Sequence, residues 1–112
     1  MEGTPNMADL FGKMAEMQQR MADTQEALGK ERVTAEVGGG MVHVTADGRG
    51  RVVAVKLEPA VVNADEMELL EDLLIAGVNK ALEEAEALRA RKMQEAASAI
   101  LPPGLDLGEM GL

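Results

Sequence analysis

The chain has 112 residues, a length that fits one domain with one small core. It contains no cysteine, which excludes disulfides, thiolate metal sites and cysteine nucleophiles, and no apolar run is long enough to span a bilayer. A cytoplasmic location is therefore expected. The formal net charge of −9 argues against nonspecific attraction to nucleic acid, unless the basic groups gather in one region.

A first helix is predicted to begin near Met7, because the side chain of Asn6 can accept hydrogen bonds from the first free amides. Apolar residues then recur at the alternating spacing of a heptad seam. Gly29 is predicted to close this helix in the left-handed conformation. The seam consists of Met7, Leu10, Met14, Met17, Met21, Thr24 and Leu28.

Three strands, each with one apolar face, are predicted over residues 33–37, 41–46 and 53–58, where apolar and polar residues alternate. Gly38-Gly39-Gly40 separates the first two strands. Asp47-Gly48-Arg49-Gly50 separates the second from the third, and its Asp-Gly pair predicts a two-residue primed turn. Such short connectors imply an antiparallel meander.

A second, long helix is predicted after Pro59, with Asp65 and Glu68 as its capping box and an end near Ile100. It would be roughly 50 Å long, whereas strands of six residues span only about 20 Å. Both helices can cover the apolar face of the sheet, but the long one would carry apolar side chains beyond it. The fold class expected from the sequence is therefore α+β.

Apolar side chains beyond the sheet need another partner, and the simplest one is a second copy of the chain. The copies would join through the helical seams or the sheet edges. The alternative is a monomer whose long helix frays near residue 90. We expect an N-terminal extension over residues 1–6, a domain over 7–101 and a flexible tail over 102–112, because Pro102-Pro103-Gly104 ends helix formation.

Several short motifs occur together in the order typical of one protein family. They are Gly38-Gly39-Gly40-Met41-Val42, Val44-Thr45, Asp47-Gly48-Arg49-Gly50, Val55-Lys56-Leu57-Glu58-Pro59, Glu71-Asp72-Leu73-Leu74 and Val78-Asn79-Lys80-Ala81. In these motifs the chain resembles the YbaB/EbfC nucleoid-associated family, over about Met7 to Pro103. The resemblance implies a tweezer-like homodimer with helices projecting from a joined sheet, which binds double-stranded DNA in the bacterial nucleoid.

Candidate DNA contacts fall into three groups of basic residues, each with a structural alternative. One group lies near the end of the long helix, where cations also complement the helix dipole. Another lies on and after the first helix, where Lys13 with Glu16 and Arg20 with Asp23 could instead form ion pairs. The last flanks the hairpin glycine and could be solvated turn residues only. The candidates are Arg89, Arg91 and Lys92; Lys13, Arg20, Lys30 and Arg32; and Arg49 and Arg51.

The other reactive side chains favour structural roles. The methionines of the first helix could mimic a thioether copper site, but their place in the heptad seam favours packing. His43 is the single histidine and is interpreted as a sheet-surface residue. Ser98 is the only serine, and neither a phosphate-binding loop nor a His-Glu-x-x-His pair occurs. We therefore expect no enzyme activity, cofactor, metal, membrane or small-molecule substrate.

The sequence therefore predicts a nucleoid-associated protein that binds double-stranded DNA as a homodimer, mainly through phosphates, with a bridging, compacting or gene-regulatory role. The alternative is a protein-binding adaptor that acts through the methionine-rich helix surfaces.

Overall fold

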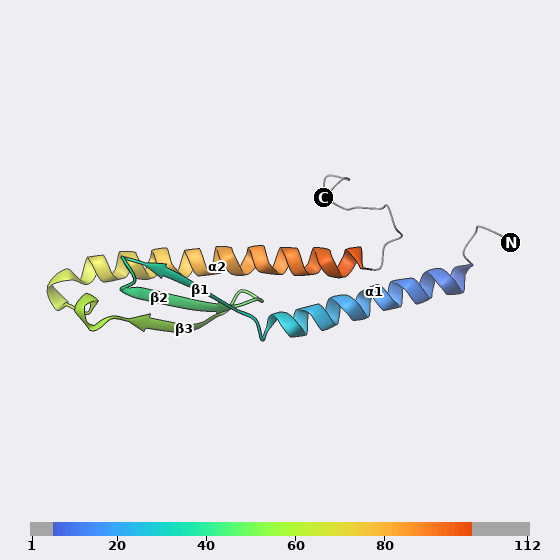
Figure 1. Cartoon of the computed structure of the whole chain (residues 1–112), viewed down its shortest axis with the longest axis horizontal. Coiled ribbons are helices and arrows are strands. Elements are labelled where there is room, and N and C mark those ends of the chain that lie inside the picture. The colour runs from blue at the N-terminus through green and yellow to red at the C-terminus, as the bar shows by residue number, and fades with distance from the viewer. Residues whose placement is uncertain (1–5, 100–112) are drawn as a thin grey trace. The chain divides into compact units, whose positions relative to one another are not determined.

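The computed structural model describes residues 6–99 and contains two long helices and one sheet (Figure 1). Helix α1 spans Met7–Leu28 and helix α2 spans Met67–Ser98. Between them lie strands β1 (Arg32–Val37), β2 (Val42–Asp47) and β3 (Val52–Leu57). The predicted α+β order is confirmed, and the described helix α2 continues well past residue 90 without fraying. The expected extension and tail fall almost entirely outside the described residues.

The chain divides into two compact units. The sheet unit is Leu28–Arg89, and it contains the three strands and most of α2. The helical unit contains α1 up to Ala27 and the last part of α2 from Ala90. Helix α2 therefore belongs to both units, and each unit is described by itself below.

Helix α1 begins as predicted but ends differently. The Oδ1 atom of Asn6 accepts a hydrogen bond from the amide of Asp9 at 2.8 Å, which confirms the N-terminal cap. Gly29 is not in the left-handed region, so the predicted closing conformation is wrong. Other groups satisfy the terminal carbonyls instead: the Arg32 guanidinium donates to Gly29 O at 2.8 Å, and the Gly48 amide donates to Leu28 O at 2.9 Å.

The sheet is an antiparallel meander in the order β1-β2-β3, as predicted. All three glycines between β1 and β2 have positive φ, which explains that run of glycines. The turn between β2 and β3 differs from the predicted primed turn, because its left-handed residue is Gly50 and not Gly48. Asp47 and Arg51 close a three-residue loop, with the Asp47 amide 2.8 Å from Arg51 O.

The turn also changes the register of β3. Thr45 pairs with Ala54, whereas Ala46 pairs with Val52, so Val53 is the extra residue of a bulge. The predicted single apolar face of β3 is therefore correct for Val55 and Leu57, which pair with buried β2 residues, but it does not continue regularly to Val53.

Helix α2 has a different start from the predicted capping box. Two short 3-10 turns, Pro59–Val61 and Ala64–Glu66, precede it. The Oδ1 atom of Asn63 accepts from the Asp65 amide at 3.0 Å, so Asn63 caps the second turn and Asp65 does not cap α2. The second 3-10 turn leads directly into α2, so the first amides of α2 follow a helical turn and α2 needs no separate capping residue.

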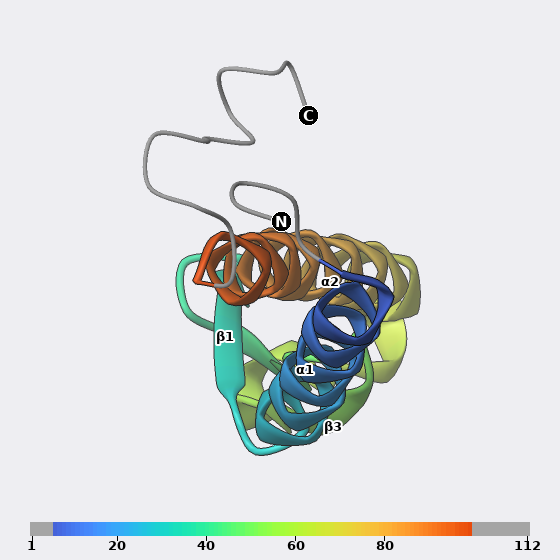
Figure 2. The same cartoon turned by 90° about the vertical axis from the view of Figure 1, so that its right-hand side faces the viewer.

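The core of the sheet unit lies between one face of the sheet and α2. Its buried members come from β1, β2, the first 3-10 turn and α2. The long helix covers the sheet as predicted, and its small residues Gly77, Ala81 and Ala85 face the strands and allow a close approach. Seen end-on, α2 lies nearer to β1 than to β3 (Figure 2).

Candidate nucleic-acid interface

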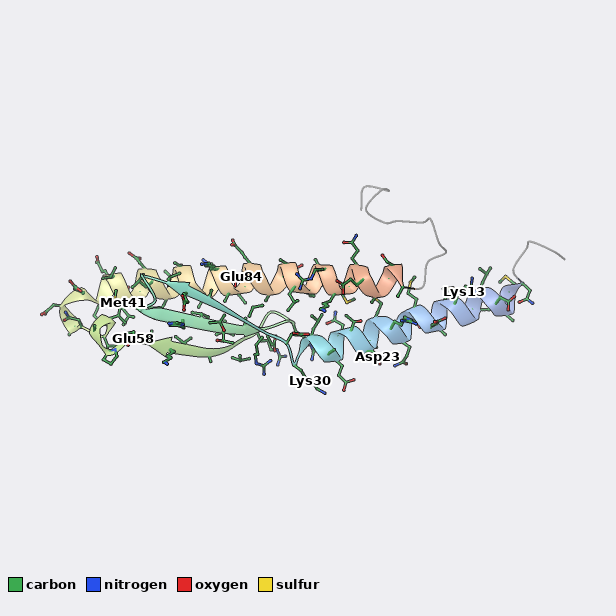
Figure 3. All side chains as sticks on the ribbon, in the orientation of Figure 1. Lys13, Asp23, Lys30, Met41, Glu58 and Glu84 are labelled. Atoms are coloured by element: carbon green, nitrogen blue, oxygen red, sulfur yellow. The ribbon has the colours of Figure 1, made fainter. Side chains whose placement is uncertain are left out.

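Four of the nine predicted basic residues come together at one end of the sheet unit. Lys30 and Arg32 lie where α1 passes into β1 (Figure 3), and Arg49 and Arg51 lie in the turn between β2 and β3. The hydrogen bond from the Gly48 amide to Leu28 O joins these two segments. We call Lys30, Arg32, Arg49 and Arg51 the turn cluster. Its members come from two segments that are separate in the sequence and meet only in the folded chain.

Gly48 allows the two segments of the turn cluster to meet. A Cβ atom at position 48 would lie 2.7 Å from Leu28 O and 2.8 Å from Leu28 Cδ2. Leu28 is itself buried, so it has little room to move. Glycine is therefore needed here for close approach and not for a positive φ, which was the reason the sequence suggested.

Asp47 organises the turn from inside. Its side chain is only 7% exposed, and its Oδ1 atom accepts from the amides of Arg49 at 2.9 Å and Arg51 at 3.1 Å. The hydrogen bond from the Arg51 amide, together with the one from Arg49 and the nearby guanidinium charges of Arg32 and Arg51, lowers the pKa of Asp47 below its ordinary value of 3.8. In the sequence, Asp47 stood out only as part of the Asp-Gly turn signal and not as a residue that organises the basic side chains.

The lowered pKa of Asp47 predicts an acid-dependent loss of stability. Because the folded pKa lies below the unfolded one, the stabilisation is complete above pH 3.8 and is lost as the pH falls through the lowered value. We expect wild type to resist urea better than Asp47→Asn at pH 7, and the gap between the two to narrow below about pH 4. A gap that stays constant down to pH 2 would contradict this assignment.

The basic residues near the end of α2 are partly neutralised. The Arg89 guanidinium donates to both carboxylate oxygens of Glu86, at 2.9 and 2.8 Å, which lowers the pKa of Glu86 and raises that of Arg89. Lys92 lies 3.9 Å from a carboxylate oxygen of Glu95. Only Arg91 of this group forms no ion pair within the described residues. The pair with Glu86 gives Arg89 a structural role that differs from the expected interaction with the helix dipole.

The two basic residues of α1 also differ from the expected pairs. Arg20 lies 3.6 Å from Glu16, one turn earlier, and not beside Asp23. Asp23 instead accepts from the side-chain amide of Gln19 at 2.9 Å. Lys13 has no ion pair among residues 6–99 and lies on an exposed part of the helix.

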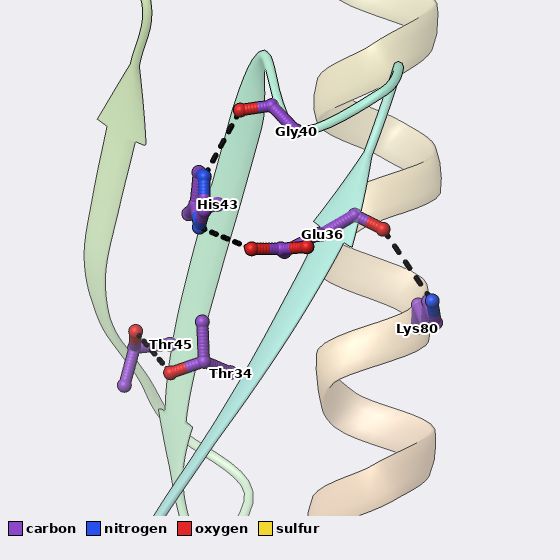
Figure 4. Close-up of polar contacts among 6 residues, drawn as sticks. All are labelled: Thr34, Glu36, Gly40, His43, Thr45 and Lys80. Carbon is purple, nitrogen blue, oxygen red and sulfur yellow. Dashed lines mark hydrogen bonds and ion pairs between the residues drawn. The ribbon is translucent and has the colours of Figure 1, made fainter.

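His43 lies on the polar face of the sheet, as the sequence suggested (Figure 4). Its Nε2 atom is 2.9 Å from Gly40 O, and its Nδ1 atom is 3.3 Å from a carboxylate oxygen of Glu36 on the neighbouring strand. Below it, the hydroxyls of Thr34 and Thr45 lie 2.9 Å apart. These cross-strand contacts hold β1 to β2 and need no metal.

One apolar surface of the sheet unit remains uncovered. Val44 and Val55 are paired across β2 and β3 and so point to the same face, yet Val44 is 0% exposed and Val55 is 45% exposed. The core therefore covers β2 at this level but leaves Val55 of β3 exposed, while Leu57 at the end of β3 is half-buried against the core. On α2 itself, Ile75 is 61% exposed and lines an open apolar hollow of about 300 Å³ with Leu74, Val78 and Asn79.

A second uncovered surface lies on α1. Phe11 is 60% exposed, and the first half of the heptad seam beside it is exposed as well. Towards the end of α1 the seam becomes half-buried and finishes at the buried Leu28. The exposed group consists of Met7, Leu10, Phe11 and Met14.

None of the helices within residues 6–99 combines the length and apolar character that crossing a bilayer requires. The same described residues hold no cluster of three histidine or carboxylate side chains placed to bind a metal ion.

The fold and the turn cluster define a small α+β protein that gathers basic side chains at one end of its sheet. A family model described as the YbaB/EbfC DNA-binding family matches residues 2–100. The chain therefore belongs to the YbaB/EbfC DNA-binding family, as its motifs suggested. This is a family of DNA-binding proteins and not a class of enzymes.

Individual relatives agree with this assignment. A nucleoid-associated protein of Moorella thermoacetica is 40% identical over 102 residues, which cover 91% of this chain and 98% of that protein. A nucleoid-associated protein of Alkaliphilus metalliredigens is 35% identical over 105 residues, covering 94% and 92%. The crystal structure of an uncharacterized Helicobacter pylori protein has a TM-score of 0.70 at 22% identity, covers 79% of this chain and 92% of that one, and supports the fold alone.

Proposed function

We propose that this protein binds double-stranded DNA as a homodimer, mainly through phosphates and with weak sequence preference, in a bridging, compacting or gene-regulatory role. The observation that carries the proposal is the turn cluster, which concentrates positive charge on a chain of net charge −9. Phosphate attraction needs such local concentration and not a positive total. The names of the relatives support a place in the nucleoid.

The uncovered apolar surface supports a homodimer. Val52 and Val55 on β3 and the hollow around Ile75 on α2 belong to the same sheet unit, and exposed apolar surface of this kind marks an interface. β3 is also an edge strand with unpaired backbone groups. In a closed two-fold dimer, a second copy of the same surface would bury these apolar side chains and pair the free backbone groups of β3. Two turn clusters in one molecule would then contact one duplex twice or two duplexes once.

A titration with linear duplex DNA at several salt concentrations tests the proposal. Log affinity is expected to fall linearly with log salt, with a slope of about −0.9 for each phosphate contacted. The variant Lys30→Gln, Arg49→Gln, Arg51→Gln is expected to flatten this slope by about 0.9 per lost contact and to weaken binding at least about tenfold. Arg32 is left in place because it caps the end of α1.

The matched control is Arg89→Gln, Arg91→Gln, Lys92→Gln, which removes the same charge from α2. We expect it to flatten the slope less, because Glu86 and Glu95 already engage two of its three cations. Equal effects would place the contact on α2 as well. No binding by wild type at low salt would overturn the proposal.

A protein-binding adaptor is the second candidate, and the exposed apolar group on α1 favours it. Methionine side chains adapt to varied partners, and Met7, Met14 and Phe11 are all more than half exposed. The duplex titration separates the two functions. An adaptor would show no saturable binding to the duplex, and neutralising the turn cluster would not change its affinity for its protein partner.

A further inference from the structure

The turn cluster contains a buried anion among its four cations. Asp47 pairs directly with Arg32 across β1 and β2 and precedes Arg49 and Arg51 in the turn. A carboxylate beside a phosphate site opposes the ligand by like-charge repulsion. Asp47 must therefore either stabilise the site by more than this repulsion costs, or use the repulsion to limit how tightly DNA binds.

The Asp47 carboxylate has two separable effects, one through the hydrogen bonds that it accepts and one through its negative charge. Its Oδ1 atom holds two successive turn amides, which orders the backbone that carries Arg49 and Arg51. A neutral amide oxygen could accept the same two hydrogen bonds. Its carboxylate forms no ion pair among the described residues, but it lies opposite Arg32 in the β1–β2 ladder and accepts from the Arg51 amide. Its charge therefore acts at short range on both residues and on a phosphate bound beside them.

We propose that Asp47 is a positioning residue and internal counter-ion of the DNA contact: its Oδ1 presents the two turn arginines, and its charge competes with DNA phosphate for Arg32 and Arg51 so that binding stays weak and reversible. This inference rests on the proposed function and adds a regulating group to the same site. It also explains why an anion is kept in the densest basic region of the sheet unit.

The two roles predict opposite effects for two substitutions. Asp47→Asn keeps an oxygen acceptor and removes the charge, so duplex binding is expected to tighten about three- to tenfold at low salt. Asp47→Ala removes both, so the turn loses its two side-chain hydrogen bonds and binding is expected to be at least about tenfold weaker than in Asp47→Asn. A purely structural residue would weaken binding in both variants.

The charge-matched control is Asp72→Asn. Asp72 precedes Leu73, which lies against Gly38 in the turn between β1 and β2, at the other end of the strands. Removing this charge is expected to change the affinity less than twofold. The amide resonances of Arg49 and Arg51 provide a second readout, since Asp47→Asn should keep both protected from hydrogen exchange and Asp47→Ala should not.

The experiment is a salt-dependent titration of full-length wild type and the three variants with one linear duplex. Tighter binding by Asp47→Asn than by Asp72→Asn, with Asp47→Ala weakest, supports the inference. Equal affinities of Asp47→Asn and Asp47→Ala overturn the positioning role, and equal affinities of Asp47→Asn and Asp72→Asn overturn the counter-ion role. Absence of binding in every protein would instead overturn the proposed function itself.

Discussion

Val55→Asp combined with Ile75→Asp is expected to convert the proposed homodimer into a monomer. Both side chains are exposed within the sheet unit, where we place the dimer interface, and each new carboxylate would have to be buried without a partner. Because the two turn clusters of the proposed dimer would act as linked binding sites, the monomer is expected to bind a long duplex about 10²- to 10⁴-fold more weakly. Sedimentation equilibrium gives the mass, and the duplex titration gives the affinity.

The control adds the same charge elsewhere. Leu10→Asp combined with Met14→Asp places two carboxylates on the exposed heptad seam of α1, which the sequence offered as the other pairing surface. We expect this variant to remain a dimer and to lose affinity only through its added charge. A monomeric mass for the α1 variant, with the β3 and α2 variant still dimeric, would move the interface to the seam.

Gly77→Ala is expected to destabilise the protein although alanine is the better helix former. Alanine in mid-helix gains about 1 kcal/mol over glycine. Here, however, the new Cβ would lie 2.8 Å from Val44 Cγ2 and 3.3 Å from Val37 Cγ2. Val44 is fully buried, and overpacking of this kind costs about 1–3 kcal/mol. The net expected change in the free energy of unfolding is a loss of up to about 2 kcal/mol.

Gly12→Ala is the matched control. Gly12 also lies within a helix, but a Cβ there meets nothing within 4 Å. The substitution is expected to stabilise the protein by about 0.5–1 kcal/mol. Urea unfolding at one fixed protein concentration measures both variants, since the midpoint of a dimer depends on concentration. Stabilisation by Gly77→Ala would show that α2 does not approach the sheet as closely as described.

Local chemistry explains why the elements could be predicted. The Asn6 cap, the alternation of β-branched residues and the breaks at Gly38-Gly39-Gly40 and Pro59 act within a few residues of chain, so periodicity and turn composition reveal them. The motifs that resemble the family lie along these same elements, and the family assignment is confirmed. The order of the helices and strands and the family could thus be predicted from the sequence alone.

The errors occur where more than one group was able to satisfy the same backbone donors or acceptors. Gly29 needs no left-handed conformation, because Arg32 and Gly48 supply the donors that close α1. Asn63 and a 3-10 turn replaced the expected cap at Asp65. In both places several groups could have met the same backbone need, and only the arrangement of the chain decides which one does.

The sequence by itself determined the α+β order, the elements and the family, because each depends on neighbouring residues. Only the tertiary structure decided that Lys30 and Arg32 meet Arg49 and Arg51 around Asp47, and that α2 covers Val44 but leaves Val55 exposed. Those facts depend on how closely Gly48 and Gly77 let separate segments approach, and such distances arise between residues that are far apart in the chain.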